Sequence, residues 1–272
     1  MTVGAATAKI NLALVVGPQR PDGRHEVVTV LQRVALADRI SIEPAAQTVV
    51  RGFPADTLVH TALARLADRA GGSVAWRATI GKRIPVAAGL GGGSSDAGTA
   101  LALANETLQT PFSESELHEL ARTLGADVPF FLRSGPQLGT ADGTELARLD
   151  LPQDYVVLLL VPEDVAKAST AVVYRSFDDR GGEQGFPERA KELQVALAAI
   201  QHPEDLARLP PNDLASSPLS DRLEELGAFR ADVSGAGPTV YGLFRDREGA
   251  RAAARALKRV GRTIVTVPAW YR

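Results

Sequence analysis

The chain has 272 residues, a formal net charge of −2 and no cysteine. Hydrophobic residues make up 45% and charged residues 23%, which is typical of a globular protein with one large domain or two modest ones. The lack of cysteine excludes disulfides, thiolate metal sites and cysteine nucleophiles. The near-neutral charge, without a long basic run, argues against nucleic acid or an anionic membrane as a partner.

The N-terminal stretch MTVGAATAKINLALVV has no basic start, and Lys9 interrupts its apolar residues. It therefore does not resemble a signal peptide. The longest apolar run, Tyr155–Val161, is far too short to cross a bilayer. We expect a cytoplasmic protein with no membrane contact, and the sequence indicates no obligate protein partner.

The first half of the chain predicts strands and helices in mixed order. Strands are expected at 8–16, 26–36, 38–44 and 74–80, helices at 56–70, 95–108 and 113–125, a turn at 21–25 and a hairpin at 135–149. Ser113 and Glu116 match a capping box at the start of the third helix.

The second half begins with a buried strand from Tyr155. Helices are expected at 187–200, 213–226 and 246–260, a glycine turn leading into a strand at 234–244, and a closing strand at 262–270. Strands and helices mix without strict βαβ alternation, which predicts an α+β fold.

The stretch IPVAAGLGGGSSDAG, Ile84 to Gly98, is the most unusual in the sequence. Glycines let a backbone approach a ligand closely, and a helix N-terminus directly after them favours an anion such as phosphate. Ser94 and Ser95 could then donate to phosphate oxygens or reach Mg²⁺, and Asp96 could cap the helix or attract the metal. The plainer alternative is a flexible surface turn.

Two familiar phosphate-binding motifs do not fit this stretch. A Walker A loop needs a lysine after its last glycine, and none follows here. A dinucleotide fingerprint needs G-x-G-x-x-G within a parallel sheet, and GLGGGS fails at its last position.

Lys9 lies inside a predicted apolar strand, where a buried lysine needs a carboxylate partner or an edge position. Asn11 is two residues further on, so both side chains should face the same polar site. Asp127 follows the expected helix stop at Gly125 and precedes apolar residues, so it could accept a proton or simply serve in a turn. A Lys9–Asp127 pair would keep the carboxylate ionised.

The glycine stretch resembles the ATP loop of the GHMP small-molecule kinases. The segments AKINLAL, PDGRHEV and GADVPFF resemble the branch of that family that acts on 4-diphosphocytidyl-2-C-methyl-D-erythritol, and SGAGPTVYG at Ser234–Gly242 is similar to the family's C-terminal glycine motif. These matches occur in the family's order and span nearly the whole chain.

The resemblance implies a two-domain kinase, with domains at 1–152 and 153–272 and the active site in the cleft between them. With Mg²⁺, ATP would phosphorylate the 2-hydroxyl of the cytidine-diphosphate substrate in non-mevalonate isoprenoid precursor biosynthesis. The implied catalytic residues are Lys9 and Asp127. The implied ATP loop consists of Pro85, Val86, Ala87, Ala88, Gly89, Leu90, Gly91, Gly92, Gly93, Ser94 and Ser95. The implied substrate-binding residues are Asn11, Arg24, His25, Thr170 and Tyr174. Gly235 and Gly237 would close the phosphate site from the opposite side.

The sequence departs from the family pattern at two of these positions. Ala87 stands where the family usually has glycine, which we expect to be tolerated if Ala87 keeps a negative φ. Arg24 stands where a tyrosine usually precedes the histidine. A guanidinium could stack on the cytosine or reach the diphosphate of the substrate, or it could point into solvent.

Two other functions remain open from the sequence. The chain could be a related kinase of another small alcohol, such as homoserine or mevalonate, although His25 and Tyr174 favour a cytidyl group. It could also be a non-catalytic nucleotide-binding module, against which Lys9, Asp127 and both glycine motifs argue.

Overall fold

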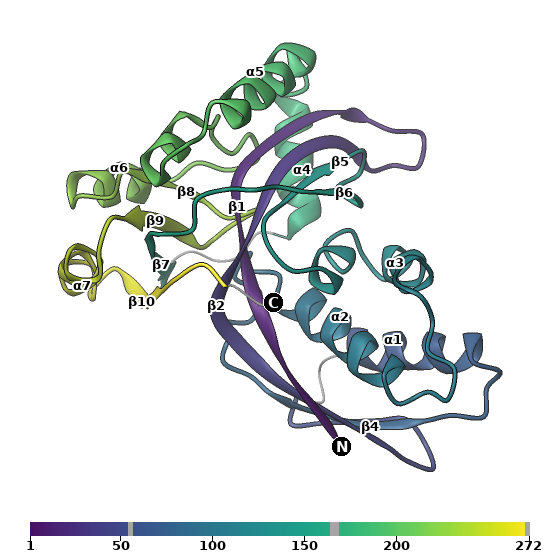
Figure 1. The fold of residues 1–272 in the computed structure, drawn as a ribbon. Coiled ribbons are helices and arrows are strands. Elements are labelled where there is room, and N and C mark those ends of the chain that lie inside the picture. Colours follow the sequence, from purple (N-terminus) through teal and green to yellow (C-terminus); the bar gives the residue numbers. More distant parts are fainter. Residues whose placement is uncertain (54–56, 164–168, 270–272) are drawn as a thin grey trace.

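Two β-sheets and the helices around them make up the fold (Figure 1). In the computed structural model, which describes residues 1–53, 57–163 and 169–269, the first sheet has the strand order β3-β4-β2-β5-β6, with β1 also paired to β2. Its strands are β1 (Thr2–Gln19), β2 (His25–Pro44), β3 (Val49–Arg51), β4 (Trp76–Gly81), β5 (Gln137–Thr140) and β6 (Glu145–Arg148). The second sheet, in the order β10-β7-β9-β8, is formed by β7 (Val156–Pro162), β8 (Arg230–Val233), β9 (Val240–Phe244) and β10 (Gly261–Thr266).

Helices flank both sheets, as expected for an α+β fold. The first half contains α1 (Thr57–Arg69), α2 (Gly92–Asn105), α3 (Glu114–Arg122) and a 3₁₀ turn at Pro129–Leu132. The second half contains α4 (Thr170–Asp179), α5 (Phe186–Ala198), α6 (Pro218–Glu225), α7 (Arg247–Ala256) and a 3₁₀ turn at Pro203–Arg208. Within the described residues, no helix is both long and apolar enough to cross a membrane.

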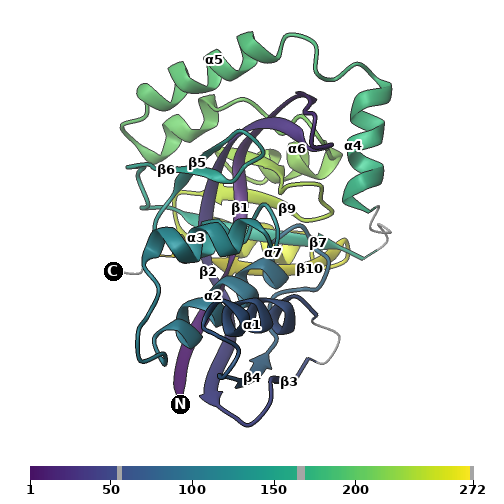
Figure 2. The same cartoon turned by 90° about the vertical axis from the view of Figure 1, so that its right-hand side faces the viewer.

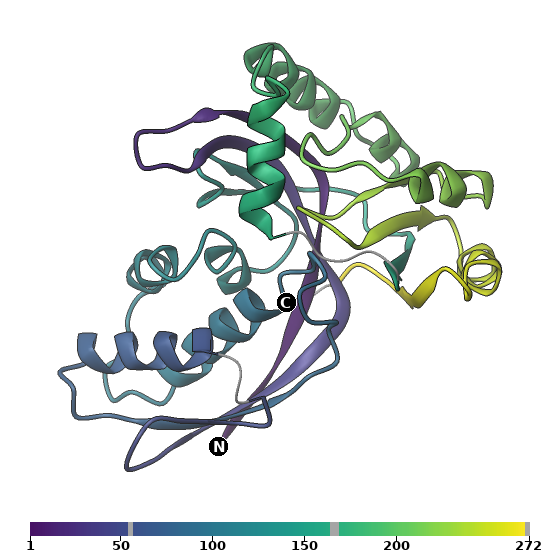
Figure 3. The ribbon, with the colours of Figure 1, turned by 180° about the vertical axis from the view of Figure 1, so that it is seen from behind.

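The long hairpin of β1 and β2 runs through the whole molecule (Figures 1 and 3). The strands expected at 26–36 and 38–44 are in fact one strand of 20 residues, β2. The register of its pairing with β1 shifts, for example between Thr7 and Ala8 of β1, and such shifts let β2 bend without breaking. Residues 6–17 of β1 are all buried, since other elements cover both of its faces. Polar side chains on this strand are therefore placed in the interior.

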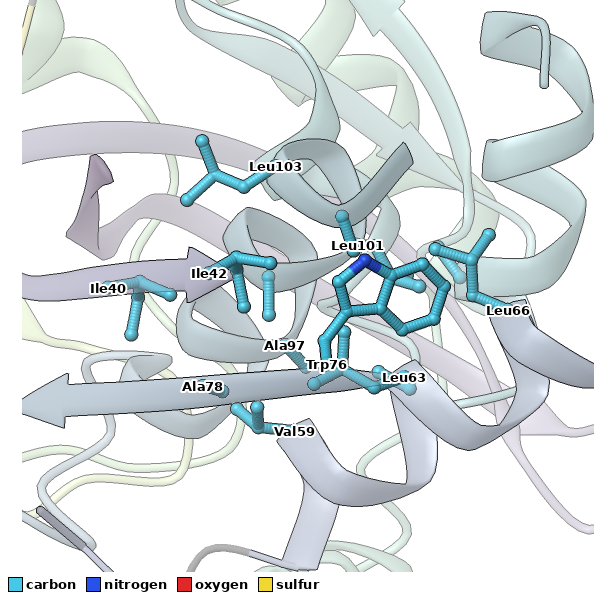
Figure 4. Close-up of a cluster of buried hydrophobic side chains, with 14 of the residues drawn as sticks. Ile40, Ile42, Val59, Leu63, Leu66, Trp76, Ala78, Ala97, Leu101 and Leu103 are labelled. Atoms are coloured by element: carbon cyan, nitrogen blue, oxygen red, sulfur yellow. The ribbon is translucent and has the colours of Figure 1, made fainter. Parts of the chain in front are cut away.

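The core of the first half packs around Trp76, whose side chain is 1% exposed (Figure 4). Leu63 and Leu66 of α1 and Leu101 of α2 contact the same cluster, and α1 lies beside α2 in Figure 2. The period-2 burial of β4 matches the sequence pattern. Asp56, the expected first residue of α1, lies outside the described residues.

The start of helix α3 agrees with the prediction from the sequence. The capping box of Ser113 and Glu116 is present at α3. The helix expected at 213–226 forms only from Pro218, where Ser217 is the N-cap and its side chain accepts from the Leu219 N–H. Asp213 lies before the helix and accepts a hydrogen bond from the Val16 backbone N–H at 2.8 Å, a contact that joins the two halves.

The two sheets share no strand among the described residues, and the predicted boundary at 152/153 falls between β6 and β7. One apolar cluster nevertheless includes Ile10 and Val30 of the first sheet together with Leu159 and Tyr241 of the second. The boundary between separate domains stays a prediction.

Candidate active site

The glycine stretch forms a loop between β4 and α2. Positive φ values occur at Ala87 (59°), Gly89 (77°) and Gly91 (68°), and Gly91 is the N-cap of α2. A residue in this left-handed region turns the chain sharply, so the loop folds back on itself directly before the helix. Helix α2 therefore begins at Gly92, earlier than expected, with its N-terminus at the loop.

The expectation that Ala87 keeps a negative φ is wrong. Its φ of 59° lies in the left-handed region, which costs an L-residue about 1–2 kcal/mol. The contacts of the loop outweigh this cost: the neighbouring Ala88 is 3% exposed, and its carbonyl accepts a hydrogen bond from the Thr239 N–H at 3.3 Å. The alanine is thus held in a glycine conformation by its surroundings.

The second glycine motif faces this loop. The Ser234 hydroxyl donates to the Gly89 carbonyl at 3.0 Å. A Cβ on Gly89 would lie 2.5 Å from the carbonyl oxygen of Ser234 and 2.7 Å from that of Gly237, so glycine is required for the close approach. The two motifs, far apart in the sequence, form one wall.

Lys9, Asn11 and Asp127 meet next to that wall. The Lys9 ammonium lies 3.5 Å from Asp127 Oδ2 and donates to Asn11 Oδ1 at 2.7 Å. The Asn11 amide donates in turn to the Thr29 hydroxyl at 2.9 Å, which fixes the orientation of the amide. Lys9 is 4% exposed, whereas the Asp127 side chain is 41% exposed. A fixed cation thus lies beside a carboxylate that remains open to a reactant.

A third group lies where the β1–β2 hairpin meets α4. The rings of His25 and Tyr174 are 4.7 Å apart, and Arg24 forms an ion pair with Asp142 from the β5–β6 turn. Burial, followed by the charge of Asp127, raises the pKa of Tyr174 to about 12, so its hydroxyl stays protonated at neutral pH. Thr170 is the first residue of α4, and the neighbouring Ser169, not Thr170, caps the helix.

These groups line one cavity of about 960 Å³. All the residues predicted for the site line it except Ser95, which is fully buried and has an unpartnered hydroxyl within the described residues. The expectation that Ser95 can reach a phosphate is therefore not supported by its position. Because α2 starts at Gly92, Ser95 comes one turn later and faces the protein interior, while Ser94 lines the cavity.

Asp96 is also placed differently from the sequence-based expectation. It does not cap α2 but accepts a hydrogen bond from Lys82 Nζ at 2.8 Å, and Lys82 also donates to Asp38 at 2.6 Å. Burial lowers the pKa of Lys82, but hydrogen bonds to Asp38 and Asp96 outweigh this and raise it. Asp38 additionally accepts from the Ile84 N–H at 2.9 Å, so this cluster fastens the start of the glycine loop to β2 and α2.

Several cavity residues carried no sequence signal. Phe53 and Leu58 add apolar surface, and Asp142 and Asp178 contact Arg24 and His25. Burial raises the pKa of Asp142, but hydrogen bonds from Thr144 and Arg24 lower it by more. The pKa of Asp142 therefore lies below its usual value. The sequence could not indicate these carboxylates, because their partners lie more than 100 residues away.

Comparison with known proteins gives consistent results. Residues 57–135 match the model for the GHMP kinases N terminal domain, and residues 190–263 match the model for GHMP kinases C terminal. The chain is 38% identical to a 4-diphosphocytidyl-2-C-methyl-D-erythritol kinase of Pelotomaculum thermopropionicum, covering 96% of this chain and 95% of that protein. It is 36% identical to the protein of that name from Nocardia farcinica, covering 94% and 89%.

Solved structures agree with the sequence relatives. A crystal structure of 4-(cytidine 5'-diphospho)-2C-methyl-D-erythritol kinase matches with a TM-score of 0.79 at 30% identity, covering 99% of this chain and 100% of that one. A mevalonate kinase matches with a TM-score of 0.74 at only 14% identity, over 98% and 99% of the chains, which shows a shared fold alone. By its domains, its glycine loops and its relatives, the chain belongs to the GHMP kinases and, within them, to the 4-diphosphocytidyl-2-C-methyl-D-erythritol kinase family.

Proposed function

We propose that this chain transfers the γ-phosphoryl group of ATP to the 2-hydroxyl of 4-diphosphocytidyl-2-C-methyl-D-erythritol, a step of non-mevalonate isoprenoid precursor biosynthesis. The observation that carries this proposal is one cavity of about 960 Å³ that joins three features. They are a glycine loop at a helix N-terminus, a lysine–aspartate pair, and an aromatic site at the far end.

The phosphates of ATP would lie against the loop of Gly89, Gly91 and Ser94. Backbone N–H groups and the positive end of the α2 dipole favour negative charge there. Gly235 and Gly237 would close the site from the other side, because their loop is hydrogen-bonded to the first.

Asp127 would accept the proton of the attacking hydroxyl, and Lys9 would stabilise the negative charge that develops on the oxygen. Phosphoryl transfer needs mostly positioning and charge neutralisation, and the bonds of Lys9 to Asn11 and Asp127 hold that charge in place before substrate arrives.

Mg²⁺ is part of the proposal, and the residues present fit it. Among the described residues, no three acidic or histidine side chains gather into a metal cluster. In kinases Mg²⁺ takes many of its oxygen ligands from the substrate phosphates, so it needs no such cluster. The Ser94 hydroxyl lines the cavity beside the loop and would supply an oxygen ligand from the protein. Bound Mg²⁺ would neutralise phosphate charge.

The cytidine end would lie among Asn11, His25, Thr170 and Tyr174, with Arg24 at its edge. The cytoplasm is the proposed location, where ATP is available, and no nucleic acid or protein partner is part of the proposal. We also propose that the chain folds as two domains, 1–152 and 153–272, with the cavity between them.

The proposed activity is tested by ADP release with 4-diphosphocytidyl-2-C-methyl-D-erythritol, homoserine or mevalonate as the acceptor, each with and without Mg²⁺. We expect release that depends on the cytidyl substrate and on Mg²⁺. Faster turnover of homoserine or mevalonate would show a related small-alcohol kinase. Tight ATP binding without turnover of any alcohol would show a nucleotide-binding module.

Arg24→Ala should raise KM for the cytidyl substrate about tenfold, because stacking on a base contributes roughly 1–3 kcal/mol. The ion pair with Asp142 fixes the planar guanidinium and offsets its charge, so it favours stacking over binding of the diphosphate. The contact is remote from the transferred phosphoryl group, so kcat and KM for ATP should hardly change.

Arg24→Tyr separates the two roles of Arg24. A tyrosine can stack but carries no charge, so it should restore most of the substrate affinity if Arg24 stacks and little if Arg24 binds the diphosphate. Wild-type KM in Arg24→Ala would show that Arg24 has neither role.

A further inference from the structure

Helix α4 holds the His25 ring by three residues on one helix face. Tyr174 lies over the ring at a centroid distance of 4.7 Å, Phe177 meets it edge-on at 6.1 Å, and Asp178 Oδ1 lies 2.7 Å from Nε2. Positions 174, 177 and 178 have the spacing that places side chains on one side of a helix. Figure 3 shows α4 alongside the hairpin end that carries His25.

These contacts fix both the orientation and the proton of the imidazole. The His25 side chain is 7% exposed, so the ring has little freedom to turn over. An ionised carboxylate can only accept hydrogen bonds, so the Asp178 contact requires a proton on Nε2. In a neutral imidazole the other nitrogen is then an acceptor. Among the described residues, His25 Nδ1 has no hydrogen-bond partner.

An unpaired acceptor of this kind can distinguish pyrimidine bases. Cytosine carries an exocyclic amino group, a donor, at the position where uracil carries a carbonyl oxygen, an acceptor. An imidazole acceptor facing that position attracts cytosine and repels uracil. The opposite tautomer would reverse the preference, so discrimination depends on which nitrogen carries the proton.

We propose that Asp178 is a positioning residue that fixes His25 as the Nε2–H tautomer and so makes Nδ1 the acceptor that selects cytosine over uracil. This rests on the proposed cytidyl substrate. Asp178 itself does not touch the base: it acts through His25, and its side chain is 45% exposed at the edge of the cavity.

The tautomer can be observed directly, without substrate, by ¹⁵N NMR of protein labelled at its four histidines. His25→Gln identifies the His25 signals. At pH 8 we expect the Nε2–H tautomer in the wild type and a mixture of tautomers in Asp178→Ala. Asp179→Asn, an exposed carboxylate on the same helix, is the matched control and should leave the signals unchanged. An Nδ1–H tautomer or an imidazolium ion in the wild type would overturn the proposal.

Base discrimination gives the second measurement. The ratio of kcat/KM for the 4-diphosphocytidyl substrate to that for its 4-diphosphouridyl analogue should fall about tenfold in Asp178→Ala, the usual effect of one well-placed hydrogen bond, while kcat stays near normal. Asp178→Asn keeps the size of the side chain but can also donate to Nε2, so it should lower the ratio as well, with an unchanged melting temperature.

The outcomes separate this inference from the proposed function. Normal turnover of the cytidyl substrate with an unchanged ratio in both Asp178 variants would overturn the role of Asp178 alone. If the wild type turns over neither analogue, the proposed function fails, and the NMR result still decides the tautomer.

Discussion

Asp127→Asn should lower kcat by at least about a hundredfold while leaving KM for ATP nearly unchanged. Asparagine has almost the same shape as aspartate but cannot accept the proton of the attacking hydroxyl. The Asp127 side chain is 41% exposed toward the cavity and pairs with Lys9 at 3.5 Å, so the substitution removes a reactive group and not a core contact. Initial rates with saturating ATP and cytidyl substrate measure the effect.

The control for this variant is Asp68→Asn, which removes the same charge from an exposed position on α1, outside the cavity. It should keep wild-type kinetics. Turnover of Asp127→Asn within a few-fold of the wild type would mean that the hydroxyl loses its proton without a protein base. Asp127 would then only orient the substrate.

Gly91→Ala should reduce kcat/KM for ATP by about a hundredfold, because small displacements of a positioned group can have effects of that size. Gly91 has a φ of 68° and caps α2, and a Cβ there would lie 2.9 Å from Lys9 Cγ and 3.0 Å from Phe131 Cζ. The methyl group would therefore strain the loop and also push the Lys9 side chain away from Asp127.

Gly71→Ala is the matched control for backbone strain. Gly71 also has a positive φ, 89°, but a Cβ there meets nothing within 4 Å, and it lies outside the cavity. The left-handed conformation should cost both variants about 1–2 kcal/mol, and the contacts of the methyl group add to this cost in Gly91→Ala, but only Gly91→Ala should lose activity. Equal kinetics of the two variants with ATP would show that the first loop does not bind the phosphates.

The sequence was most informative where a local pattern has a local cause. The capping box at Ser113 depends on neighbouring residues and is confirmed, and the strand expected at 74–80 and the helix expected at 56–70 form as β4 and α1. Lys9 and Asn11 were expected to face one polar site because they alternate on a strand, and they are hydrogen-bonded. The motifs together also indicated the family, which the comparisons confirm.

The long-range arrangement, by contrast, had no local signal. The left-handed Ala87 is held by a hydrogen bond from Thr239 to its neighbour Ala88, and the inward-facing Ser95 follows from a helix start set by the loop. Asp96 accepts a hydrogen bond from Lys82, and Asp178 contacts His25. No sequence pattern predicts these two pairings. Residue types and short periodicities thus specified most elements and the glycine stretches, and the resemblance to the family singled out Lys9 and Asp127, which lie 3.5 Å apart. Packing of distant segments decided which backbone strain is tolerated and which carboxylate contacts the histidine, because the Thr239–Ala88 and Asp178–His25 contacts form only once the two halves meet.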